Sequence, residues 1–206
     1  MLFNALVIFS FLVVLLMLRR LIGIMPSLLA CMIRWKENIN LEDSVKLSRD
    51  RDYLALAMIV PFCLLAFRYR LYSPGFVEPM SDNAVLGLYF AIFLAYLVVR
   101  VMVTMTFRPH KMPKKIFGTA VKTSYSFFII CTLVLLATVA VMSVADASDV
   151  HIRNAMLWIS ALIYMLLLIR KVQIFSTSCS VFAAFLYLCA LEMIPTGILV
   201  VSAMIF

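Results

Sequence analysis

One acidic residue, Glu192, lies inside a long apolar run near the end of the chain. Pro195 follows it by three residues and Tyr187 precedes it by five. A carboxylate in apolar surroundings costs free energy unless the fold gives it a partner. The apolar run of residues 83–107 also contains one charge, Arg100. We therefore predict a buried polar site made of Arg100, Glu192, Pro195 and Tyr187.

The depth of the two charges supports a direct pairing. At about 1.5 Å per helical residue, Arg100 lies about 24 Å from one end of its run and Glu192 about 16 Å from the opposite end of its own. In an apolar layer about 30 Å thick, the two depths differ by roughly 8–10 Å, which long side chains and helix tilt can close. We predict an ion pair that fixes helix register, with a proton or ligand site as the alternative.

Motifs for other chemistries are missing from the sequence. His110 and His151 fall in different loops, and the five cysteines form no C-x-x-C pair. The sequence contains no H-E-x-x-H, no G-x-S-x-G and no phosphate-binding G-x-x-x-x-G-K-[ST]. A single carboxylate is also only half of an acid–base pair. We therefore expect a protein without catalytic residues, cofactor or metal.

The amino-acid composition indicates the class of protein in which these residues lie. Of the 206 residues 66% are hydrophobic and 14% are charged, and the mean hydropathy is +1.10. A soluble domain has about 45–50% apolar and about 25% charged residues. The net charge of +8 comes from basic residues at the ends of apolar blocks, where they contact lipid head groups rather than nucleic acid. The sequence predicts an integral membrane protein, with the bilayer and other membrane proteins as partners.

The apolar blocks predict an all-α, polytopic helical bundle with a single transmembrane domain over residues 1–206. A span needs roughly 20 residues. Six blocks approach that length: residues 2–18, 53–72, 83–107, 123–145, 154–169 and 181–206. A five-span arrangement, with the second block on the surface, is the alternative.

The segment 21–52 is predicted to lie along the inner membrane interface, with a re-entrant course of residues 21–33 as the alternative. Residues 21–33 are apolar but too few to cross the bilayer as a helix, and they contain Gly23 and Pro26. Polar residues 37–52 follow, with an amphipathic helix expected over residues 41–47.

The loop charges predict the orientation. With the amino terminus outside, the inner loops hold 14 of the 18 Lys and Arg residues and the outer loops hold three. This bias follows the positive-inside rule and places both termini on the side of the membrane away from the cytoplasm. The basic inner loop supplies candidate contacts to anionic lipids at Arg108, Lys111, Lys114 and Lys115. The alternative is that this loop only fixes topology.

The string from Phe185 to Pro195 resembles a family pattern. It reads Phe-Leu-Tyr-x-Cys-x-Leu-Glu-x-x-Pro, and it is similar to the carboxy-terminal helix of an uncharacterised family of multipass inner-membrane proteins of Bacteroidota. That family is classed as a domain of unknown function. The resemblance implies a bacterial inner-membrane protein and no assigned activity. In such a protein the predicted orientation would place both termini in the periplasm.

Three functions remain open from the sequence. The first is a non-enzymatic component or scaffold of an envelope process such as secretion, insertion or lipid handling. The second is a small secondary transporter that uses Glu192 as its coupling carboxylate. The third is a lipid-active membrane enzyme.

Overall fold

The computed structural model describes residues 2–72, 81–106, 113–177 and 180–205, and all regular elements in these ranges are helical. They are α1 (Leu2–Ile33), α2 (Trp35–Asp43), α3 (Val45–Ala57), α4 (Ile59–Arg68), α5 (Asp82–Thr106), α6 (Lys114–Val144), α7 (Asp149–Ser176), α8 (Val181–Leu188), a π-helical turn (Cys189–Met193) and α9 (Ile194–Ile205). The predicted all-α class is confirmed.

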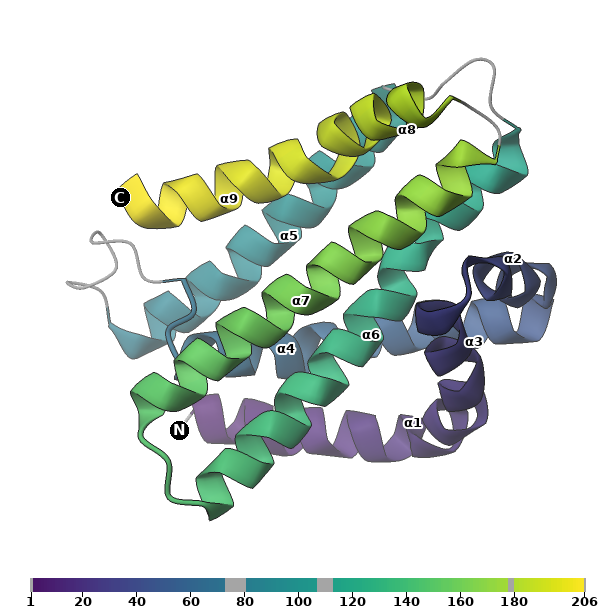
Figure 1. Cartoon of the computed structure of the whole chain (residues 1–206). Helices are drawn as coiled ribbons and strands as arrows, with labels where there is room; N and C mark the ends of the chain where they lie inside the picture. The colour runs from purple at the N-terminus through teal and green to yellow at the C-terminus, as the bar shows by residue number, and fades with distance from the viewer. Residues whose placement is uncertain (1, 73–80, 107–112, 178–179, 206) are drawn as a thin grey trace.

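Helix α1 continues past the predicted end of the first span. The sequence predicts a span over residues 2–18, closed by Arg19 and Arg20, whereas the helix itself is unbroken to Ile33. Arg20 is accommodated at mid-helix by Asp50, 3.7 Å away, and by the ring of Tyr53 at 5.4 Å. The ribbon bends, and its second half turns across the end of the bundle (Figure 1). Pro26 lies in that half, and a proline inside a helix removes one backbone hydrogen bond and kinks it.

The second half of α1 buries one apolar face. Leu21, Ile24, Leu28 and Cys31 follow helical spacing and pack in one cluster with residues of α3 and α6. The interfacial placement of residues 21–52 stays a prediction. Within that segment the amphipathic helix expected over 41–47 is wrong, because α2 ends at Asp43 and α3 starts at Val45. Ser44 separates them and its hydroxyl accepts a hydrogen bond from the Leu47 N–H.

Helices α3 and α4 follow one another almost directly and are joined at Met58. They are therefore longer together than the predicted second block of residues 53–72. Phe62 of α4 packs against Phe93 of α5 and Phe128 of α6, with ring centroids 5.5 and 5.3 Å apart. Such aromatic pairs contribute about 0.5–1.5 kcal/mol each beyond the area they bury. This cluster fixes α4 against the long helices.

The long helices match the predicted blocks in place but not always in length. Helix α5 has almost the predicted bounds, whereas α6 begins nine residues earlier and α7 extends beyond both predicted ends. Helices α8 and α9 continue one another through the π-helical turn. They run side by side with α5, α6 and α7 along the bundle (Figure 1). The first residues of α1, the last of α9 and the α6–α7 connection lie at one end, and α2 lies at the other (Figure 1).

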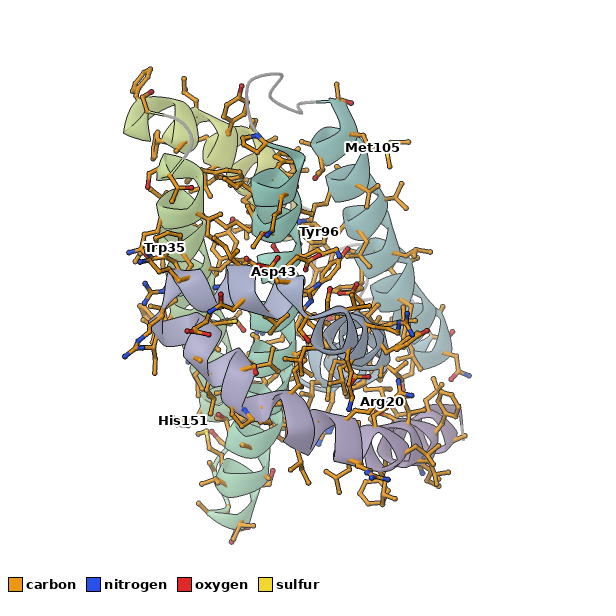
Figure 2. All side chains as sticks on the ribbon, turned by 90° about the vertical axis from the view of Figure 1, so that its right-hand side faces the viewer. Arg20, Trp35, Asp43, Tyr96, Met105 and His151 are labelled. Atoms are coloured by element: carbon orange, nitrogen blue, oxygen red, sulfur yellow. The ribbon has the colours of Figure 1, made fainter. Side chains whose placement is uncertain are left out.

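Four of the described helices are long and apolar enough to cross a membrane by length and composition: α1, α5, α6 and α7. The other two predicted crossings are built from shorter helices in series, α3 with α4 and α8 with α9, so the count of six stays a prediction. Large apolar side chains cover the outside: Met105 is 75% exposed and Trp158 is 73% exposed. Met105 lies on the outer side of α5, whereas Tyr96 of the same helix points inward (Figure 2). The helices are consistent with a multipass membrane protein.

Candidate functional site

A buried charge cluster joins the long helices. Glu192 is 3% exposed and lies in the π-helical turn between α8 and α9. Its Oε1 atom accepts a hydrogen bond from Arg100 Nη2 of α5 at 2.6 Å and another from Lys171 Nζ of α7. Arg100 Nη2 also donates to the buried Ser124 hydroxyl of α6. We call Arg100, Ser124, Lys171 and Glu192 the Glu192 cluster.

The π-helical turn explains how a glutamate and a proline fit here together. The N–H of Ile194 donates to the carbonyl of Cys189, five residues back, just before Pro195. Pro195 itself is buried. The backbone carbonyl of Glu192 accepts a hydrogen bond from the Tyr164 hydroxyl at 3.1 Å, and Thr196 Oγ1 donates to the same atom. Single π turns inside α-helices occur frequently at functional sites.

The Arg100–Glu192 pairing predicted from the sequence is present. Tyr187, grouped with them from the sequence, instead packs against the apolar cluster around Phe117 and Phe175. Of the four candidate anionic-lipid contacts, Arg108 and Lys111 and the side chain of Lys114 lie outside the described residues. Lys115 pairs with Asp43 at 2.7 Å, and that pair is half exposed.

Sequence reasoning missed Lys171. Together with Arg170 it resembles a basic pair that ends a span, but α7 continues to Ser176. The four-residue spacing of Lys171 from apolar residues on either side could have indicated its burial. Ile163, Leu167, Lys171 and Phe175 recur every four residues, and all four are buried. Lys171 therefore lies on the inward face of its helix rather than in a loop.

A second polar cluster lies at the end of the bundle that carries α2 and α3. Arg51 of α3 is 2% exposed, and its Nη2 lies 3.0 Å from Glu42 Oε2 and 2.8 Å from Asp52 Oδ1. Lys122 Nζ of α6 contacts Glu42 Oε1 at 2.6 Å, and the Ser48 hydroxyl donates to Glu42 Oε2. We call Glu42, Ser48, Arg51, Asp52 and Lys122 the Arg51 network. It fixes α2 and α3 to the start of α6.

Two further hydrogen bonds dock the end of α1. Asn38 Nδ2 donates to the carbonyl of Cys31 at 3.2 Å, and Arg170 Nε donates to the carbonyl of Met32 at 2.8 Å. The last carbonyls of a helix lack partners within the helix. These contacts therefore close α1 and fasten it to α2 and α7.

We expect Glu42 to make stability depend on pH in the acid range. Burial alone would raise the pKa of Glu42, but hydrogen bonds from Lys122 and Arg51 and their charges lower it below its ordinary value of 4.5. The stabilisation is therefore present above pH 4.5 and is lost as the pH falls through the lower pKa of the folded state. Chemical unfolding of the wild type and Glu42→Gln, from pH 7 downward, should show their difference shrinking below pH 4.5. A difference that stays constant with pH would contradict this assignment.

Within the described residues, no group of three His, Cys, Asp or Glu side chains could hold a metal ion. His151 lies beside Ser148, with Nδ1 2.6 Å from the hydroxyl, while His110 lies outside the described residues.

Comparison with known proteins identifies the family. A family model described as Domain of unknown function (DUF4271) matches residues 1–202. The chain belongs to the DUF4271 family. The expectation of an uncharacterised family is confirmed. No curated protein and no solved structure matches this DUF4271 chain.

Proposed function

We propose that this DUF4271 protein is a bacterial inner-membrane protein with six crossings that acts without catalysis. Its role is a component or scaffold of an envelope process such as secretion, insertion or lipid handling. The observation that carries the proposal is the Glu192 cluster, in which one carboxylate oxygen binds cations from two other helices. In this proposal the cluster fixes the register of the helices, which a rigid scaffold requires.

The distribution of charge supports the same role. The described apolar helices expose large side chains over their outer surfaces, as lipid contact requires. Exposed basic residues include Lys46 and Arg49 of α3 and Lys115 of α6, which pairs with Asp43 of α2. These residues are suited to anionic head groups or to an acidic partner.

The test is gentle extraction of the tagged chain in a mild detergent, followed by identification of co-purifying proteins. We expect one partner in a fixed ratio to the chain, and no proton-dependent flux in proteoliposomes. Arg68→Gln serves as a control, because Arg68 is exposed and lies far from the Glu192 cluster in the bundle. A chain that purifies alone and carries proton-dependent flux would overturn the scaffold role.

A second candidate, a small transporter, is favoured by one specific observation. The Oε2 atom of Glu192 is buried and has no hydrogen-bond partner among the described residues. An unpaired acceptor inside a π-helical turn is where a proton or substrate could bind. Flux in proteoliposomes that Glu192→Gln abolishes, with expression and assembly unchanged, would favour transport over scaffolding.

The proposed topology has a direct test. Single cysteines replace Lys115 or Val150 in a cysteine-free background, and intact cells are treated with a membrane-impermeant thiol reagent. Both positions are exposed on the protein. We expect labelling at position 150 in intact cells and at position 115 only after permeabilisation. The reverse pattern would invert the orientation.

A further inference from the structure

The Glu192 cluster carries an excess of positive charge. Arg100 and Lys171 are cations and Glu192 is the one carboxylate that both of them contact. The two neighbouring phenols, Tyr96 and Tyr164, add no counter-charge. The sum is one net positive charge in an apolar bundle, and a buried charge without a counter-ion is costly.

The cluster also has unused hydrogen-bond donors. Among the described residues, both hydrogen bonds of the Arg100 guanidinium come from Nη2, so Nε and Nη1 are left without a partner. The Lys171 ammonium has three N–H donors and contacts Glu192 alone within the same ranges. The spare donors call for an acceptor, and the excess charge calls for an anion. A single oxyanion satisfies both requirements.

The site can be reached through Arg100. The Arg100 side chain is 15% exposed, against 3% for Lys171 and 4% for Glu192. Arg100 lies six residues before Thr106, the last residue of α5, which places it about 9 Å along the helix from that end. The exposed part of the Arg100 side chain therefore lies close to the end of α5 and to the head-group region expected there. A ligand from that region or from the adjoining solution therefore meets the guanidinium first.

We propose that Arg100 and Lys171 form a binding site for one phosphate-type oxyanion, taken either from a lipid head group or from free phosphate. The site differs from the basic loop around residues 108–115 and involves no exposed lysine. It does not depend on the scaffold role, so either proposal can fail without the other.

The experiment measures anion binding to the purified full chain in two forms. The first uses protein in a neutral detergent with radiolabelled inorganic phosphate. The second uses nanodiscs of phosphatidylcholine with and without phosphatidylglycerol, and native mass spectrometry counts the anionic lipids that stay bound. Saturable phosphate binding identifies a free anion, and retention of one anionic lipid identifies a head group.

Two variants remove the excess charge and keep a neutral ion pair. Lys171→Met leaves Arg100 with Glu192, and Arg100→Leu leaves Lys171 with Glu192. Each should weaken anion binding at least tenfold, whereas Arg68→Gln, which also removes one positive charge, should leave it unchanged. Wild-type protein that binds neither probe would overturn the proposal. Binding by Lys171→Met that equals the wild type would overturn it as well.

Discussion

Glu192→Leu is expected to lower the free energy of unfolding by about 3–5 kcal/mol, the largest effect of any single change considered. The substitution leaves the side chains of Arg100 and Lys171 close together with no carboxylate between them. Unfolding in a mild detergent mixed with increasing SDS measures the loss. As a control, Asp43→Leu removes a carboxylate that is half exposed and paired with Lys115, which should cost less than about 1 kcal/mol.

The single changes at the cations should be milder. Arg100→Leu leaves Glu192 paired with Lys171, and Lys171→Met leaves it paired with Arg100. If Arg100 and Glu192 paired only with each other, Arg100→Leu together with Glu192→Leu should recover much of the stability. In the structure this double variant leaves Lys171 buried without its carboxylate partner. Recovery should require the triple variant with Lys171→Met, because apolar replacement of a whole buried ion cluster is often neutral or stabilising. A triple variant no more stable than Glu192→Leu would contradict this account.

Arg51→Met is expected to give the second largest loss, about 2–3 kcal/mol. Arg51 is 2% exposed and donates to both Glu42 and Asp52, so its removal leaves two carboxylates with fewer partners. The loss stays below that at Glu192 because Glu42 keeps its contact with Lys122. The matched control is Arg49→Met, since Arg49 is an exposed arginine on the same helix. Equal losses for the two variants would show that the Arg51 network contributes nothing specific.

The sequence predicts best where one physical requirement dominates. Helix α5 was placed within one residue at each end because its apolar block stands between polar residues. The contact of Arg100 with Glu192 followed from the cost of leaving either charge unpaired in an apolar layer.

Contacts were missed from the sequence where one residue type can serve in two ways. Arg19, Arg20 and Lys171 all resemble the basic residues that end a span, yet each lies inside a helix. Arg20 is tolerated because Asp50 approaches it from another helix, and Lys171 because Glu192 does. Both partners are distant in sequence, so local patterns could not reveal them. The Arg51 network was missed for the same reason, since Lys122 and Glu42 are 80 residues apart.

The most direct test of the central claim, that Glu192 binds Lys171 of α7 in addition to Arg100 of α5, is a distance measurement in lipid bilayers. Solid-state NMR on protein labelled with 15Nζ-lysine and 13Cδ-glutamate detects close Lys–Glu pairs through dipolar dephasing. Among the described residues two close pairs are expected, Lys171 with Glu192 and Lys122 with Glu42. Lys171→Met should remove one part of the dephasing and Lys122→Met the other. Dephasing that is unchanged by Lys171→Met would contradict the account.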